Sequence, residues 1–133
     1  TRVYDYNPSK IFLLIGTNDL RDGKSQEAVV QNIEKIIEEI QTNRKQADIF
    51  VESLYPVNAS VSSAVGIRSN ETIQNINVQL KEYCKEKNLT YIDLHAKLQD
   101  EQGNLQAQYT VDGLHLSDAG YQIVAGVLQK YLK

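Results

Sequence analysis

Apolar residues follow two alternating patterns along the chain, short continuous runs and longer stretches with helical spacing. The continuous runs occupy residues 10–15, 49–54 and 89–94, and runs of this length are typical of strands buried on both faces. After each run, apolar residues recur three or four positions apart, at Val29, Ile33, Ile36, Ile37 and Ile40, then at Ile73, Ile76, Leu80, Tyr83 and Cys84, and finally at Val124, Val127, Leu128 and Tyr131. This spacing predicts three helices.

Strand and helix alternate three times, which predicts an α/β fold. Repeated strand–helix units imply a parallel sheet with right-handed crossovers and helices on both faces, in three layers. Residues 58–69 form a polar, serine-rich loop that we expect to shape a pocket. No internal repeat or low-complexity linker marks a boundary, so residues 1–133 are interpreted as one domain.

Composition excludes several classes of partner. The chain has 133 residues, 41% of them hydrophobic, and a net charge of −3 with both signs interspersed, which does not favour nucleic-acid binding. Its apolar runs are too short to insert stably in a membrane, and no signal-peptide core is present. Cys84 is the only cysteine, which excludes an internal disulfide and leaves the compartment, cytoplasmic or secreted, open.

The chain contains no methionine. Even an initiator residue is therefore missing from it, and the first predicted strand begins about ten residues in. From this we expect that an N-terminal part of the natural protein lies outside the sequence.

Two polar clusters carry candidate chemistry. Asp112 and His115 lie three residues apart, a spacing that lets the carboxylate reach one ring nitrogen while the other faces outward, as in the back half of a catalytic triad. Gly16-Thr17-Asn18-Asp19 follows an apolar run that begins at Ile11 and ends at Ile15. That places it at the carboxyl end of a buried strand, where open α/β sheets bind ligands. We expect the two clusters to share one crevice.

Each candidate has a structural alternative. Asp112 and His115 could be a turn aspartate and a surface histidine, since Asp-Gly is a common turn signal. Asn18 could cap the turn after its strand. Asp19 is interpreted as a structural residue that caps or pairs locally.

Other candidates are weaker. His95 is interpreted as a strand-end residue, and Ser53 lacks the sharp strand-to-helix turn that exposes a nucleophile. Cys84 has no histidine at a spacing that suggests a catalytic pair. Asp112, His115 and Asp118 could together bind a metal, but no further histidine or cysteine with ligand spacing accompanies them, so we expect no metal and no cofactor.

The two motifs, in this order and with these elements between them, resemble the SGNH hydrolases, the superfamily of GDSL-type lipases and esterases. Gly16-Thr17-Asn18-Asp19 is similar to the family's third block, Gly-x-Asn-Asp, and Asp112-Gly113-Leu114-His115 to its fifth, Asp-x-x-His. The similarity extends over the whole chain. It implies a flavodoxin-like sheet of which this chain supplies the C-terminal portion.

The chain departs from the family at its start. The Gly-Asp-Ser block that carries the nucleophile and the glycine of the second block are absent. By the resemblance, the missing segment would supply at least one further strand–helix unit, with its strand beside residues 11–15. We expect the exposed edge and uncovered apolar side chains of that run to recruit a second copy, or to retain a cleaved N-terminal fragment.

The resemblance also implies a function, the hydrolysis of small acyl esters of lipids or acetylated sugars. His115 would act as general base and then general acid, Asp112 would orient it, and Asn18 would donate to the oxyanion, with Gly16 and Thr17 in contact with substrate. By itself the fragment would be inactive. Two other functions remain open, a non-catalytic relative that uses the fold to bind a ligand, and a flavodoxin-like binding domain that matches by coincidence.

Overall fold

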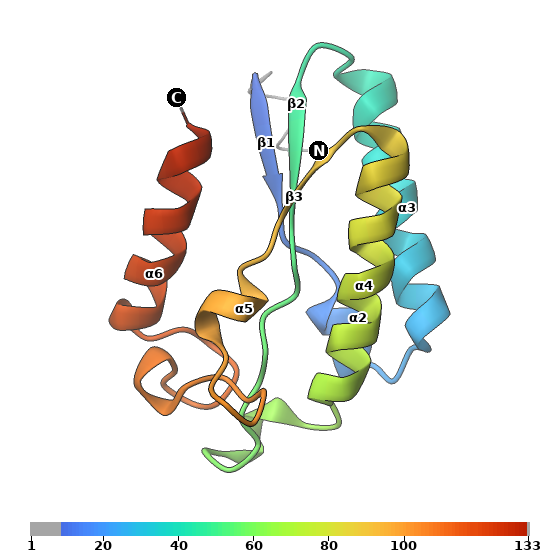
Figure 1. Ribbon diagram of the computed structural model, residues 1–133. Helices are drawn as coiled ribbons and strands as arrows, with labels where there is room; N and C mark the ends of the chain where they lie inside the picture. Colours follow the sequence, from blue (N-terminus) through green and yellow to red (C-terminus); the bar gives the residue numbers. More distant parts are fainter. Residues whose placement is uncertain (1–8, 133) are drawn as a thin grey trace.

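The sheet consists of three parallel strands. The computed structural model describes residues 9–132, and its strands β1 (Lys10–Leu13), β2 (Asp48–Glu52) and β3 (Thr90–Ile92) lie side by side in the order β1-β2-β3. Leu13 pairs with Val51, which in turn pairs with Tyr91. All three strands run in the same direction, toward the lower part of Figure 1, where α2, α5 and the long loops gather. The predicted α/β fold with a parallel sheet is confirmed.

Helices cover both faces of the sheet. On one face α3 (Gln26–Asn43) packs beside α4 (Asn70–Lys87), and α6 (Asp118–Leu128) with the short helix η3 (Gln129–Tyr131) covers the other (Figure 1). The hydroxyls of Ser25, Ser69 and Ser117 each accept a backbone N–H in the first turn of α3, α4 and α6, which starts these helices where their apolar spacing begins.

Two apolar clusters form the core, one on each face. Nearly all of the predicted helix positions from Val29 to Cys84 are buried in the first cluster, against Ile11, Leu13 and Val51. In the second cluster Phe50 stacks on Phe12 with ring centroids 4.7 Å apart, under Val124 of α6. Alternate side chains of β1 and β2 thus point to opposite faces, as a doubly covered sheet requires.

The strands end earlier than the apolar runs predict, and short helices follow them. β1 stops at Leu13, and the side chain of Leu14 is 43% exposed rather than buried. The chain then turns at Gly16 into α2 (Thr17–Arg21), and after β3 it turns into α5 (His95–Leu98). Helices this short have too little apolar periodicity to be recognised from the sequence. The loops also contain the single-turn helices η1 (Ser63–Val65) and η2 (Ala107–Tyr109).

The edge of β1 differs in part from the expectation. Among residues 9–132 only β2 pairs with β1, so its other edge carries no described strand. Two of the apolar side chains are nevertheless covered, since Ile11 is 4% and Leu13 8% exposed, whereas Leu14 just beyond the strand is 43% exposed. The expectation of uncovered side chains is wrong for Ile11 and Leu13, which pack into the core cluster on the face of α3 and α4, but it holds for Leu14.

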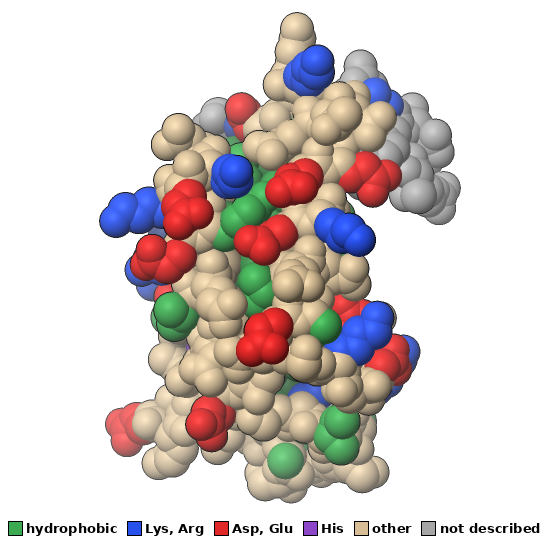
Figure 2. All heavy atoms as spheres, turned by 90° about the vertical axis from the view of Figure 1, so that its right-hand side faces the viewer, with side chains coloured by type: hydrophobic (Ala, Val, Ile, Leu, Met, Phe, Trp, Pro, Cys, Tyr) green, Lys and Arg blue, Asp and Glu red, His purple; other side chains and the backbone are tan. Residues whose placement is uncertain are grey.

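The outer face of α3 and α4 carries acidic and basic side chains interspersed, with a narrow apolar strip between them (Figure 2). This face has no patch of a single sign of charge of the kind that nucleic-acid-binding surfaces show.

Candidate active site

The Asp112–His115 segment lies in a loop that one threonine hydroxyl organises. Oγ1 of Thr110 accepts the backbone N–H of Gly113 at 2.8 Å and donates to the carbonyl of His115 at 2.7 Å. Thr110 also forms an isolated antiparallel bridge with Leu116. The loop is therefore closed at its base, which fixes the position of the residues at its tip.

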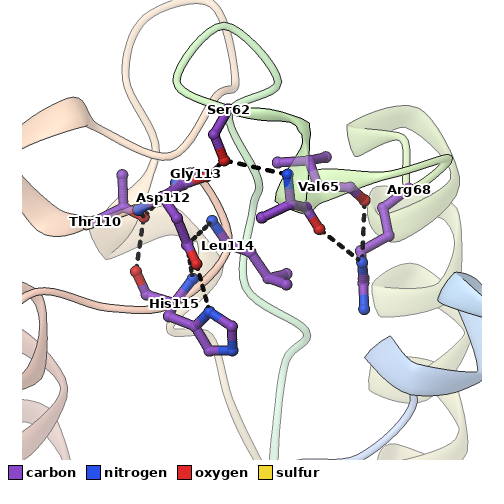
Figure 3. Close-up of polar contacts among 9 residues, drawn as sticks. Ser62, Val65, Arg68, Thr110, Asp112, Gly113, Leu114 and His115 are labelled. Carbon is purple, nitrogen blue, oxygen red and sulfur yellow. Dashed lines mark hydrogen bonds and ion pairs between the residues drawn. The ribbon is translucent and has the colours of Figure 1, made fainter.

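Gly113 anchors this loop to the serine-rich segment 58–69. Its φ of +88° is a conformation that favours glycine, and its carbonyl accepts the N–H of Asn58 at 2.8 Å. A Cβ at this position would collide with the carbonyl oxygen of Asn58. Nearby, Oγ of Ser62 donates to the carbonyl of Asp112 at 2.6 Å (Figure 3). The two loops thus hold each other in place.

The carboxylate of Asp112 and the imidazole of His115 meet as the spacing predicts. Oδ2 of Asp112 lies 2.7 Å from Nδ1 of His115, and Oδ1 accepts the backbone N–H groups of Leu114 at 2.9 Å and His115 at 2.7 Å (Figure 3). These hydrogen bonds, the imidazole's first among them, lower the pKa of Asp112 to about 2. Because an ionised carboxylate only accepts, it places the ring proton on Nδ1 and leaves the lone pair of Nε2 available as a base.

The second cluster occupies α2. Gly16 has a φ of +118° and begins the helix, and a Cβ there would lie 3.2 Å from Val29 and Ile33 of α3. The Asp19 carboxylate accepts a hydrogen bond from Nδ2 of Asn32 at 3.0 Å and lies 3.6 Å from Nζ of Lys24. It therefore joins α2 to α3. Asp19 thus has the structural role that we expected.

Asn18 and His115 line the same pocket. Its volume is about 240 Å³, and most of its wall is apolar. The lining residues are Leu14, Ile15, Thr17, Asn18, Leu54, Tyr55, Pro56, Val57, Arg68, Leu114, His115, Leu116 and Tyr121. Thr17 is among them and Gly16 is not, so Gly16 shapes the turn behind the pocket.

Ser53 and His95 lie apart from this pocket, in the buried layer between β2 and β3. Ser53 is fully buried, and its Oγ accepts the N–H groups of Leu94 at 3.0 Å and His95 at 2.9 Å. His95 is 6% exposed, and burial lowers its pKa. Burial likewise raises the pKa of the Cys84 thiol to about 11, far from that of a reactive thiolate. All three have structural positions.

Among residues 9–132, no three His, Cys, Asp or Glu side chains come close enough to hold a metal ion, and Asp118 lies in the first turn of α6, which Ser117 caps. The described part of the chain also has no helix of the length and hydropathy that crossing a membrane requires.

Sequence reasoning missed two residues that shape the pocket. Thr110 supports the loop of Asp112 and His115 without lining the pocket. Asn77 is buried in α4 and bonds both the N–H and the C=O of Leu54, at 2.8 and 3.0 Å, which fixes the chain where it lines the pocket. The signal for Asn77 is present in the sequence, since a polar residue stands on the apolar face of the helix next to Ile76 and four positions after Ile73.

The chain is similar to known proteins over most of its length. Residues 2–123 match the model of the GDSL-like lipase/acylhydrolase family. Among solved structures, a protein from Streptococcus pneumoniae described as a candidate platelet activating factor superposes with a TM-score of 0.87 and 39% identity, over 94% of this chain and 60% of that one.

Two curated proteins are similar over nearly the whole chain. The N-acylneuraminate cytidylyltransferase of Escherichia coli O18:K1:H7 is 28% identical over 92% of this chain and 28% of its own length. A GDSL esterase/lipase of Oryza sativa subsp. japonica is 28% identical over 95% of this chain and 54% of its own. The chain spans less than two thirds of the length of each of these proteins. With the family model matching most of its residues, the chain belongs to the GDSL-like lipase/acylhydrolase family.

Proposed function

We propose that this chain is the C-terminal part of a larger domain that hydrolyses acyl esters by a Ser-His-Asp mechanism. The observation that carries the proposal is the 2.7 Å contact between Nδ1 of His115 and Oδ2 of Asp112, with the amide of Asn18 at the same pocket. A base oriented by a carboxylate, beside a hydrogen-bond donor for an oxyanion, is the arrangement that acyl transfer requires.

Nε2 of His115 removes the proton of a serine hydroxyl as that oxygen attacks the ester carbonyl. The carbonyl π electrons move to its oxygen, and Asn18 donates its side-chain amide to the resulting oxyanion. Asp112 stabilises the imidazolium, which then gives its proton to the leaving alcohol as the C–O bond breaks. Water repeats the sequence on the acyl-serine and releases the carboxylic acid. Thr17 lines the pocket around the acyl group, and Gly16 shapes the turn behind it.

We place the serine in a segment that precedes Thr1. No serine hydroxyl of residues 9–132 forms a hydrogen bond with His115, and the one at the end of β2, Ser53, is used by backbone N–H groups. Among residues 9–132, no strand lies beside β1 on the side away from β2, and a further parallel strand placed there would have its carboxyl end next to α2 and the pocket. In the absence of that strand, a second copy of the chain or a cleaved N-terminal fragment would pair with this edge.

The pocket is compatible with a small acyl group on a lipid or an acetylated sugar. Leu14, Leu54 and Leu116 give it apolar walls for an acyl chain, while Thr17 and Tyr121 offer hydroxyls to a polar alcohol.

The test compares chain 1–133 with the same chain extended at its N-terminus as its gene encodes it. We expect the extended protein to hydrolyse short-chain p-nitrophenyl esters and to be labelled by a fluorophosphonate probe, and residues 1–133 alone to do neither. Light scattering of the short form should show a dimer or larger species. If the extended protein neither turns over esters nor is labelled, the family fold serves as a non-catalytic binding module here.

A further inference from the structure

The guanidinium of Arg68 is held in the wall of the pocket by neutral acceptors. Nε donates to Oγ1 of Thr17 at 2.9 Å and to its carbonyl at 3.2 Å, and Nη1 donates to the carbonyls of Val65 at 3.0 Å and Ala64 at 3.4 Å. Arg68 is 8% exposed. Among residues 9–132, no carboxylate lies within ion-pairing distance of it. A cation this buried is ordinarily paired.

One nitrogen of this guanidinium is left over. Nη2 has no acceptor in the described part of the chain, yet it is not among the buried polar atoms that the protein encloses without a partner. It therefore remains accessible, in a residue that lines the pocket with His115. Arg68 and His115 extend from two different loops on either side of Leu114, toward the same side (Figure 3).

The rest of the pocket wall leaves this charge unopposed. Among the described residues that line the pocket, Arg68 alone has a permanent charge, and the others are apolar or uncharged apart from the titratable imidazole. In a partly desolvated site, a guanidinium N–H with a free hydrogen is a strong donor to an oxyanion. Its hydrogen bonds to Thr17 and the loop carbonyls pre-orient it, so that little freedom is lost when an anion binds.

We infer that Arg68 selects acyl esters that carry an oxyanion, a carboxylate or a phosphate, on the alcohol side of the ester. The inference rests on the proposed function, because it names the substrates of that same site. Arg68 would contact the anion through Nη2 while its other nitrogens keep the 58–69 loop joined to α2. The enzyme would therefore prefer negatively charged substrates over their uncharged analogues.

The experiment measures kcat/KM of the N-terminally extended protein on two matched substrate pairs. One pair is an O-acetylated hexuronic acid and its methyl ester, and the other is 1-acetylglycerol 3-phosphate and 1-acetylglycerol. The wild-type protein should prefer the charged member by about tenfold in at least one pair, the value of a charge-assisted hydrogen bond. The pair with the larger preference identifies a carboxylate or a phosphate.

Arg68→Gln should reduce that preference to near one, and Arg68→Lys should retain part of it. Arg21→Gln is the matched control, because Arg21 is an exposed arginine nearby that pairs with Asp22, and its loss should leave the preference unchanged. An Arg68→Gln variant that loses activity equally on both members of each pair would show that Arg68 only fastens the loop, and the inference would be wrong.

Direct binding keeps the test independent of catalysis and of how Arg68→Gln folds. Calorimetric titration of the wild-type protein with hexuronic acid and its methyl ester, and with glycerol 3-phosphate and glycerol, should show about tenfold tighter binding of one charged member. Equal binding within both pairs overturns the inference even if the protein is an active esterase. Failure of the proposed function looks different, since no ester is then hydrolysed whatever its charge.

Discussion

The two histidines of this chain follow an aspartate at almost the same distance, yet they occupy opposite environments. His115 lies three residues after Asp112, its side chain is 69% exposed, and its Nδ1 is bonded to the carboxylate. His95 lies two residues after Asp93, is 6% exposed, and has a buried Nε2 without a partner. One ring is available to a substrate, and the other is part of the core.

The backbone between aspartate and histidine explains the difference. In the Asp112 loop, Gly113 takes a positive φ, and the turn brings Oδ2 back to the imidazole. Asp93 instead accepts the N–H of Ala96 through Oδ1, as a helix cap does, and α5 begins at His95. An aspartate near a histidine becomes a catalytic candidate only when the turn between them directs both side chains to the same side.

The largest expected effect separates the two histidines by activity. In the N-terminally extended protein, His115→Ala should lower kcat on p-nitrophenyl acetate by at least about 10³-fold, because the base is removed. His95→Leu should change kcat less than about threefold per folded molecule, since its ring lies outside the pocket. Steady-state kinetics with the folded fraction measured by circular dichroism decide the point. Wild-type turnover in His115→Ala would remove it from the mechanism.

The next effect isolates the contribution of the carboxylate. In Asp112→Asn, the side-chain oxygen can still accept the N–H groups of Leu114 and His115, so the turn persists. The new amide N–H group faces Nδ1, however, which forces the ring proton to Nε2 and removes the base. We expect kcat to fall by about 10³- to 10⁴-fold with a melting temperature close to wild type. Asp118→Asn, which alters a carboxylate at the start of α6, is the control and should keep its activity.

Ser53 tests the buried side of the comparison. Ser53→Ala leaves the N–H groups of Leu94 and His95 without an acceptor in the core, which should cost about 2–4 kcal/mol of unfolding free energy. In the N-terminally extended protein, the folded fraction of the Ser53→Ala variant should still react with the fluorophosphonate probe. Ser63→Ala, at an exposed loop position, should change stability by less than about 0.5 kcal/mol. If Ser53→Ala were stable but no longer labelled, Ser53 would be the nucleophile after all.

Most of the helices and strands can be predicted from the sequence, because burial makes apolar residues recur at regular spacing. The two long helices and the three strands follow from apolar spacing at residues such as Ile33 and Ile76, and the Asp112–His115 pair follows from its spacing and the glycine between. The features that the apolar pattern does not predict are set by tertiary contacts. Leu14 belongs to an apolar run yet turns outward at the pocket, because the chain leaves the sheet at Leu13 to reach Gly16.

The site residues likewise divide into some that the sequence identifies and others that depend on tertiary contacts. Local chemistry marks Asn18, which follows a strand, but nothing local shows that Arg68 reaches across 51 positions to hold Thr17. The role of the Thr110 hydroxyl cannot be predicted from the sequence either, because it depends on how the loop closes on itself. Long-range polar contacts have no periodicity, and a single sequence therefore does not reveal them.

The smallest expected effect is a difference in pH dependence between the two regions. Burial lowers the pKa of His95 from its ordinary 6.5, although the negative charge of Asp93 opposes the shift. Below pH 6.5 the unfolded chain therefore binds a proton that the folded chain excludes, and the unfolding free energy should decline by up to about 1.4 kcal/mol per pH unit as the pH falls. Asp112, whose pKa is lowered from 3.8 to about 2, should contribute its loss only below pH 3.8. Urea unfolding of the wild type and of His95→Leu at pH 8 and pH 5 isolates the contribution of His95. His95→Leu should remove the decline between these values and equal or exceed the wild type at pH 5, because no hydrogen bond of Nε2 is lost. A parallel decline in His95→Leu and wild type would assign the pH dependence to another group.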